Sequence, residues 1–148
     1  MKKKVVIPII IILIIGIFTS LTLYRMYREE QEKQELKAQA RYNVIKESVK
    51  KAVEWNISAQ YPKCEISKEF KETTSPGTFY NSKFLINNGY IKKDELLDID
   101  NESYCDIFVD INTYYENPLD HQQNCEIYYK IYLKCKGYKD KGYQDWGL

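Results

Sequence analysis

One apolar stretch constrains this chain more than any other feature of its sequence. The stretch runs from Val5 to Tyr24 without a charged residue, and its polar members are Thr19, Ser20 and Thr22. A bilayer core about 30 Å thick is crossed by a helix of roughly 20 mainly apolar residues. The stretch therefore predicts a transmembrane helix. A cleaved signal peptide and a buried core helix are the alternatives, but no A-x-A-like cleavage site follows the run.

The residues that flank the apolar run predict its orientation. Three lysines at positions 2–4 precede it, whereas Arg25 and Arg28 follow it together with several glutamates. Basic residues near the ends of a membrane helix favour the cytoplasmic side, and acidic residues have little influence. We therefore expect residues 1–4 to be a cytoplasmic basic N-terminus and residues 5–24 to cross the cell membrane once. The remainder of the chain should then lie outside the cytoplasm.

The segment after the apolar run contains no glycine or proline until Pro62. Residues 25–37 are mostly charged or Gln, which is typical of a solvated stalk. Apolar residues then recur at helical intervals and predict an amphipathic helix: these are Leu36, Ala40, Val44, Ile45, Val49, Ala52 and Val53. We expect a stalk and amphipathic spine helix over residues 25–61, continuous with the membrane helix. Two helices with a hinge near residues 28–34 are the alternative.

Two segments of the second half alternate strictly, residues 104–111 and residues 125–136. Cysteine and mainly aliphatic residues occupy one face of each segment, and charged or aromatic residues occupy the other, which predicts half-buried strands. Because a loop joins the two strands, they should pair antiparallel as a C-terminal β-hairpin. The favoured register joins opposite charges and two aromatic rings: it pairs Asp106 with Lys134, Asp110 with Lys130, and Phe108 with Tyr132.

The same register predicts how the four cysteines pair. It places Cys105 opposite Cys135, and Cα atoms about 4.5 to 5.5 Å apart across a hairpin are within disulfide reach. An even number of cysteines in a small extracytoplasmic domain is typical of disulfides, and the chain has no C-x-x-C motif. We predict Cys105–Cys135 and, for the remaining pair, Cys64–Cys125. Residues 62–148 should then form a small disulfide-stapled extracytoplasmic domain, since small cores commonly need covalent support.

The aromatic residues of the polar strand faces are candidates for an interaction surface. Phe108, Tyr128 and Tyr132 all fall on the face that is predicted to point away from the core. The chain also contains 14 tyrosines. A tyrosine-rich contact surface is one reading of this number, and the codon bias of an AT-rich genome is the other.

Charge and motifs argue against several function classes. The net charge is +1 and no basic stripe is present, so we expect no nucleic-acid partner. His121 is the sole histidine, which argues against a metal site and against His-based catalysis. We therefore expect no catalytic residues, no cofactor and no enzymatic activity. The acidic group between Asp94 and Glu102 lacks the Asx and Gly positions of an EF-hand loop. We expect it to be a solvated loop, and calcium binding is the open alternative.

The order of these segments resembles the architecture of type IV pilins and pseudopilins. Three motifs are more specific, namely LINNGYIK from Leu85, CDIFVDI from Cys105 and YKIYLKC from Tyr129. With Gly142-Tyr143 they look like short, membrane-anchored, pilin-like proteins of low-GC Gram-positive bacteria. The resemblance implies an α+β fold, in which the N-terminal helix packs on a small antiparallel sheet, and it implies a location at the cell surface.

The chain departs from filament-forming pilins in one respect. Those proteins carry a Gly before the processing site and a Glu at the fifth apolar position, whereas Gly16 here lies within the apolar run and Leu21 follows five residues later. This argues against assembly by the usual prepilin route. We expect a structural or interaction role, as a minor component of a secretion or pilus-type system, with protein partners or further copies of the chain. A membrane-tethered ligand-binding or sensing module is the alternative.

Overall fold

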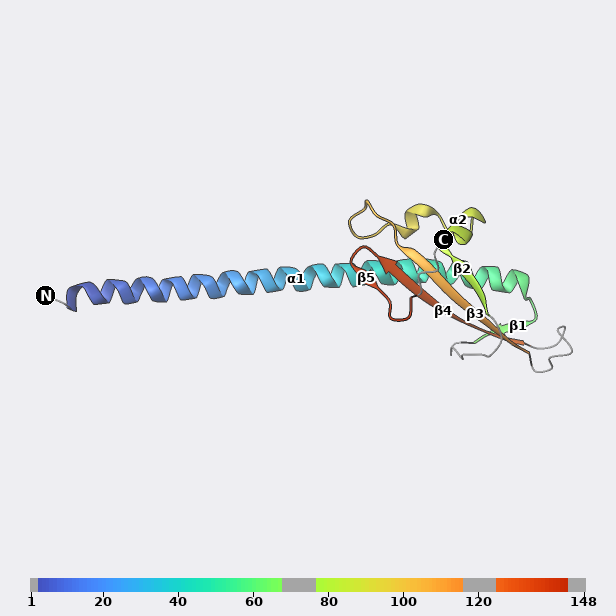
Figure 1. Ribbon diagram of the computed structural model, residues 1–148, viewed down its shortest axis with the longest axis horizontal. Coiled ribbons are helices and arrows are strands. Elements are labelled where there is room, and N and C mark those ends of the chain that lie inside the picture. The colour runs from blue at the N-terminus through green and yellow to red at the C-terminus, as the bar shows by residue number, and fades with distance from the viewer. Residues whose placement is uncertain (1–2, 68–76, 116–124, 144–148) are drawn as a thin grey trace. The chain divides into compact units, whose positions relative to one another are not determined.

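The structure combines one long helix with a small mixed sheet (Figure 1). It is a computed structural model that describes residues 3–67, 77–115 and 125–143, with side chains from residue 12 onward. The elements, in chain order, are α1 (Lys3–Gln60), β1 (Cys64–Ile66), β2 (Thr78–Asn81), α2 (Ser82–Asn87), the 3-10 helix η1 (Lys93–Leu96), β3 (Asp106–Tyr115), β4 (Cys125–Cys135) and β5 (Tyr138–Lys139). The predicted α+β class is confirmed.

Helix α1 is unbroken from Lys3 to Gln60, so the alternative of two helices is wrong. The chain nevertheless divides into two compact units, residues 1–39 and residues 40–148, and α1 contributes to both. The hydrogen bond from Tyr61 N to the carbonyl oxygen of Ile57, 2.8 Å long, closes the last turn. Pro62 follows directly, and a proline cannot continue the hydrogen-bond pattern of a helix.

The first unit exposes its large apolar side chains. Those from Ile12 to Tyr24 have between 49% and 68% of their surface exposed. The serine and threonine hydroxyls in this stretch donate to carbonyl oxygens of the preceding turn: Thr19 to Ile15 at 3.0 Å, Ser20 to Gly16 at 2.8 Å and Thr22 to Phe18 at 3.1 Å. Over the described part of the chain, no helix contains a segment with the length and apolar character of a membrane span.

In the second unit, the C-terminal part of α1 lies against one face of the sheet (Figure 1). The predicted apolar face is confirmed from Ile45 onward, where Ile45, Val49, Ala52 and Val53 are buried. It is wrong for Leu36, Ala40 and Val44, which are exposed. On the sheet, the buried aliphatic residues are Ile107, Val109, Ile111, Ile127 and Leu133. Burying one such side chain stabilises a fold by about 1.5 to 3 kcal/mol. The core of this unit is therefore the layer between α1 and the sheet.

The predicted hairpin register is confirmed. Strands β3 and β4 pair antiparallel, with Asp106 opposite Lys134 and Phe108 opposite Tyr132. The ladder is longer than predicted, because the pairing continues to Tyr115 opposite Cys125. Residues 112–115 therefore belong to the strand and not to the predicted connecting loop.

The expectation of a purely antiparallel sheet is wrong. The strand order is β1-β4-β3-β2, β5 also pairs with β4, and β1 runs parallel to β4. The reason lies in the tight turn after α1, where Cys64 N donates to the carbonyl oxygen of Tyr61 over 3.1 Å. This turn brings Cys64 level with Cys125, and both strands then run in the same direction. A three-residue strand is too short to show alternation in a sequence.

We predict that Gly77→Ala destabilises the second unit, because an added Cβ would lie 2.8 Å from both the Ile111 carbonyl oxygen and Asn112 Oδ1. Overpacking of this kind costs about 1 to 3 kcal/mol. The free energy of unfolding from urea titrations measures the effect. The matched control is Gly137→Ala, since a Cβ there meets no atom within 4 Å. Equal stability of the two variants would contradict the prediction.

Candidate functional site

The aromatic residues predicted as an interaction surface form a packed layer. Phe108 and Tyr128 are buried, so the expectation that they are exposed is wrong, and only Tyr132 is partly accessible. The Phe108 ring stacks on Phe79 at a centroid distance of 5.2 Å and meets the tilted Tyr132 ring at 5.9 Å. The Lys130 ammonium lies 5.3 Å from the Tyr132 ring centroid. Neighbouring side chains therefore cover much of this face.

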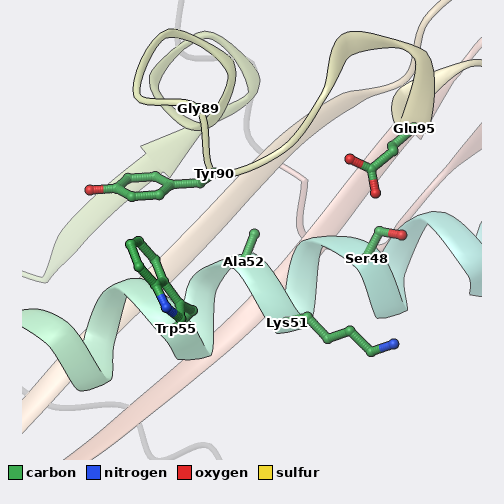
Figure 2. A pocket seen from close by; sticks show the side chains of 7 residues that line it. All are labelled: Ser48, Lys51, Ala52, Trp55, Gly89, Tyr90 and Glu95. Carbon is green, nitrogen blue, oxygen red and sulfur yellow. The ribbon is translucent and has the colours of Figure 1, made fainter.

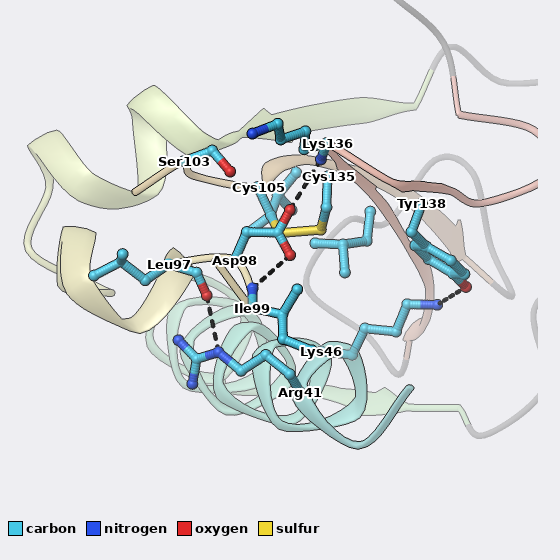
Figure 3. Close-up of a disulfide and its surroundings, with 12 residues drawn as sticks. Arg41, Lys46, Leu97, Asp98, Ile99, Ser103, Cys105, Cys135, Lys136 and Tyr138 are labelled. Atoms are coloured by element: carbon cyan, nitrogen blue, oxygen red, sulfur yellow. Dashed lines mark hydrogen bonds between the residues drawn. A yellow bond between two sulfur atoms is a disulfide. The ribbon is translucent and has the colours of Figure 1, made fainter. Parts of the chain in front are cut away.

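The two predicted disulfides are both present, and a carboxylate is buried beside one of them (Figure 3). The Cα atoms are 4.5 Å apart in Cys64–Cys125 and 4.2 Å apart in Cys105–Cys135. Asp98 lies next to the second bridge with 1% of its surface exposed. The expectation of a solvated acidic loop is therefore wrong for this residue.

Backbone N–H groups satisfy the Asp98 carboxylate. Ile99 N donates to Oδ1 over 2.6 Å, and Lys136 N donates to Oδ2 over 3.0 Å. Tyr42 of α1 also hydrogen-bonds Asp98. Burial raises the pKa of the Tyr42 hydroxyl most, and the negative charge of Asp98 raises it further. Arg41 Nε donates to the carbonyl oxygen of Leu97 over 2.8 Å. Asp98 thus joins the loop before β3, the turn after β4 and the helix.

The residues around Asp98 do not form a competent metal site. Its oxygen and the sulfur atoms of Cys105 and Cys135 lie within 4.8 Å of one another, but the two sulfurs are bonded together and are not thiolates. Asp100 is also engaged, since hydrogen bonds from Ser103 N and Glu102 N hold the pKa of its carboxyl well below the usual range. These carboxylates act as acceptors within the fold, which favours a structural role over calcium binding.

A second polar cluster attaches the segment after β4 to α1. Lys46 Nζ lies 2.7 Å from Asp140 Oδ1, and the Tyr138 hydroxyl donates to the same oxygen over 2.6 Å. The Asp140 N–H donates to the carbonyl oxygen of Leu133, and Leu133 N donates to Asp140 Oδ2. The Tyr138 ring stacks on Tyr42 at 4.6 Å. These contacts fasten Tyr138 and Asp140 to Lys46 and Tyr42 of α1.

A shallow pocket opens between α1 and the segment from α2 to η1 (Figure 2). Its volume is about 400 Å³, and it is lined by Ser48, Lys51, Ala52, Trp55, Gly89, Tyr90 and Glu95. The Trp55 and Tyr90 rings approach each other with centroids 5.6 Å apart and planes inclined at 56°. Figure 2 shows Glu95 pointing toward Ser48, whereas Lys51 points away from both rings.

Local structure positions both walls of the pocket. Ser48, Ala52 and Trp55 lie on one side of α1 at helical spacing. On the other wall, Asn81 caps α2 by accepting from Phe84 N, and Gly89 follows the helix with a φ of +71°. Glycine adopts this left-handed conformation without a Cβ penalty, as is usual after a helix. Tyr90 N then donates to the carbonyl oxygen of Leu85 over 2.9 Å.

Packed aromatic rings link Tyr90 to the core. Its ring meets Phe84 at 6.0 Å, and Phe84 stacks on Tyr80 at 4.5 Å. The Tyr80 hydroxyl donates to Asn56 Oδ1 on α1 over 2.7 Å, and both of these residues are buried. At the other end of the pocket, Lys92 N donates to Glu95 Oε2 over 2.8 Å. Contacts within the fold therefore fix the positions of the Tyr90 ring and the Glu95 carboxylate.

The pocket offers binding groups of several kinds: aromatic faces, a hydroxyl, an ammonium and a carboxylate. It is the strongest candidate site in the described part of the chain, and sequence reasoning missed it. The available signal was the tryptophan at position 55 of the predicted helix. Its exposure, 65% of its surface, is visible only in the structure. His121, which a catalytic reading of the sequence would need, lies outside the described residues.

Comparisons with known proteins do not assign this site or this fold. No family model, no curated protein and no solved structure matches the chain.

We predict that Asp98→Ala destabilises the fold, because Lys136 N and Ile99 N would lose their acceptor next to the buried disulfide. A hydrogen bond to a charged group such as the buried Asp98 carboxylate contributes about 1.5 to 3 kcal/mol. Thermal and urea unfolding of the oxidised protein measure this loss. Asp94→Ala is the control, since Asp94 is exposed in the same acidic segment. A loss no larger than that of the control would refute the role given to Asp98.

We also predict a pH dependence from the Lys46–Asp140 pair. Burial alone would raise the pKa of Asp140, but hydrogen bonds from Lys46, Tyr138 and Leu133 outweigh it and lower the pKa below 3.8. A depressed carboxyl pKa contributes stability above the unfolded value, and this contribution is lost as the pH falls through the folded value. Asp140→Asn should therefore cost about 1 kcal/mol at pH 7 and progressively less below pH 4.

Urea titrations of the wild type and Asp140→Asn at several pH values test this dependence. The pKa of Lys46 is raised above 10.5: burial alone would lower it, but hydrogen bonds to Asp140 and Tyr138 outweigh this effect. The stability difference between the two proteins should therefore stay constant from about pH 5 to pH 10. A difference that is unchanged at pH 2.5 would show that the charge of Asp140 contributes nothing.

Proposed function

We propose that the protein is a single-pass membrane protein whose C-terminal unit acts outside the cytoplasm in a structural or interaction role. The N-terminal helix is the anchor, with residues 1–4 in the cytoplasm and residues 5–24 in the bilayer. The observation that carries this proposal is the exposure of every large apolar side chain from Ile12 to Tyr24. A helix that is apolar all round needs a protein core or a membrane to cover it.

The hydroxyl groups of this stretch support a lipid environment. Polar groups in hydrocarbon must find partners within their own segment. Thr19, Ser20 and Thr22 do so by donating to carbonyl oxygens of the preceding turn. These three hydroxyl donors are therefore satisfied within the helix.

The disulfides support a location outside the cytoplasm. Disulfides persist in oxidising compartments and are rare where thiol reductants are abundant. Here Cys64–Cys125 and Cys105–Cys135 both stabilise the unit formed by residues 40–148. The orientation with the C-terminal unit outside places all four cysteines where such bonds can last.

The pilin-like part of the proposal is supported by the order of elements. A helix with an apolar N-terminal part precedes the sheet, and its C-terminal part lies on the sheet (Figure 1). Because Leu21 stands where a prepilin carries Glu, we assign a minor or accessory role in a secretion or pilus-type machine rather than the main filament subunit. The pocket at Trp55 favours a second candidate, a tethered ligand-binding module.

Anchoring is tested by expressing the full chain in a Gram-positive host and extracting its membranes with alkaline carbonate. We expect the protein to stay with the membrane, and protease added to intact protoplasts should digest the C-terminal unit. Ile15→Lys combined with Phe18→Lys should release it, because a lysine near the helix centre costs about 2.5 to 3.5 kcal/mol for insertion. Leu36→Lys is the control, since Leu36 is 70% exposed and lies outside the apolar run.

Two results would contradict this proposal. Recovery of the wild type in the soluble fraction would exclude the anchor, and protection from external protease would reverse the orientation. The interaction role is tested separately by cross-linking in intact cells. An absence of both cross-linked partners and cross-linked copies would favour the ligand-binding alternative.

A further inference from the structure

We propose that the pocket between α1 and the α2–η1 segment is a saccharide-binding site, with Trp55 as the stacking platform and Ser48 and Glu95 as hydrogen-bonding groups. A sugar ring has an apolar C–H face and a polar rim, and the pocket presents the matching surfaces. Its volume of about 400 Å³ lies within the usual range for ligand sites, roughly 300 to 1,000 Å³.

Trp55 is exposed and stands beside a second aromatic ring. The indole is 65% exposed, although the neighbouring α1 residues Asn56 and Ile57 are almost completely buried. Tyr90 stands at an angle of 56° to it, so the two rings form a corner and not a closed stack. An exposed tryptophan beside a second fixed aromatic ring offers a flat apolar face, onto which the C–H groups of a sugar ring can pack.

The polar groups around this corner favour a neutral, hydroxyl-rich ligand. The Ser48 hydroxyl both donates and accepts, and the Glu95 carboxylate accepts. Figure 2 shows these two groups facing each other, whereas the Tyr90 hydroxyl and the Lys51 ammonium point away from them. Lys51 and Glu95 together give the lining no net charge, although the Lys51 side chain points away from both rings (Figure 2). A cationic ligand is therefore the alternative that the experiment below separates from a sugar. Sugar hydroxyls also donate and accept, which matches this mixture of groups.

The site is organised in advance, which reduces the entropy lost on binding. The Tyr90 ring is packed against Phe84, which stacks on the buried Tyr80. One Glu95 oxygen accepts from Lys92 N, which orients the carboxylate. Figure 2 shows this carboxylate on the same side of the pocket as Ser48.

This inference does not depend on the anchor. The lining residues all belong to the unit formed by residues 40–148, and none of them lies in the apolar stretch of residues 5–24. Failure of the carbonate extraction test would leave the pocket untouched, and failure to bind sugars would leave the anchor untouched.

The test uses the full chain in a polyoxyethylene detergent, whose headgroup is uncharged and contains no sugar. The probes are the trimers of β-1,4-linked N-acetylglucosamine, cellotriose and maltotriose. The readout is the NMR shift of the Trp55 indole N–H, which is distinguished from that of Trp146 with a Trp55→Phe sample. We expect a saturable shift with at least one of the three sugars.

Variants then locate the binding. Trp55→Ala should raise the Kd for that sugar at least about tenfold. Glu95→Gln should raise it several-fold while keeping an oxygen that can accept from Lys92 N. Tyr114→Ala is the control and should leave the Kd unchanged, since Tyr114 is 52% exposed and pairs with Glu126 on the sheet. Equal melting temperatures of the variants establish that each is folded.

Three results would overturn the proposal. The first is no shift of the Trp55 signal with any of the sugars at about 10 mM, which corresponds to a binding free energy weaker than roughly 3 kcal/mol. The second is an unchanged Kd in both Trp55→Ala and Glu95→Gln. The third is tighter binding of choline or of a lysine-rich peptide than of every sugar, which would make the pocket a cation site.

Discussion

The rest of the C-terminal unit depends on the pairing of β3 with β4, because this ladder fixes which side chains face α1. One register places the aliphatic residues of both strands against the helix and brings Cys105 level with Cys135. The disulfide then holds the end of the ladder, and the buried Asp98 beside it fastens the loop before β3 to the turn after β4. Because side chains alternate between the two faces of a strand, the same register brings Phe108 and Tyr132 together on the face opposite α1.

Local patterns made much of this fold predictable. The alternation of the two long strands, the opposite charges of Asp106 and Lys134, and the helical spacing of Ile45 and Val49 each contain their structural information within a few residues. The parallel strand β1 escaped prediction because three residues show no period. Its place is set by a turn that has no local sequence pattern and by the Cys64–Cys125 bond. That bond was predicted, but as the remaining cysteine pair it does not show that a strand begins at Cys64.

The candidate site was hidden for a related reason. The walls of the pocket come from distant segments, and the sequence does not show that the glycine before Tyr90 turns its ring toward Trp55. The exposure of the strand residues was equally hard to predict. Alternation shows which residues share a face of a strand, but it does not show whether other side chains cover the face turned away from the helix. Phe108 and Tyr128 are buried on the face that was expected to be open. Asp98 is buried because distant backbone N–H groups satisfy it.

The bridge between Cys64 and Cys125 has a mechanical consequence. Tension applied between the N-terminal helix and the C-terminus would pass from Cys64 directly to Cys125, across a sequence separation of 61 residues. The intervening chain, which contains β2, α2, η1 and β3, lies outside this covalent path. At roughly 3.3 Å per extended residue, about 200 Å of contour length is shielded from the load while the bond is intact. An oxidised molecule that is pulled by its N-terminal helix would therefore stretch far less than a reduced one, and the pocket wall at Tyr90 would remain outside the loaded path.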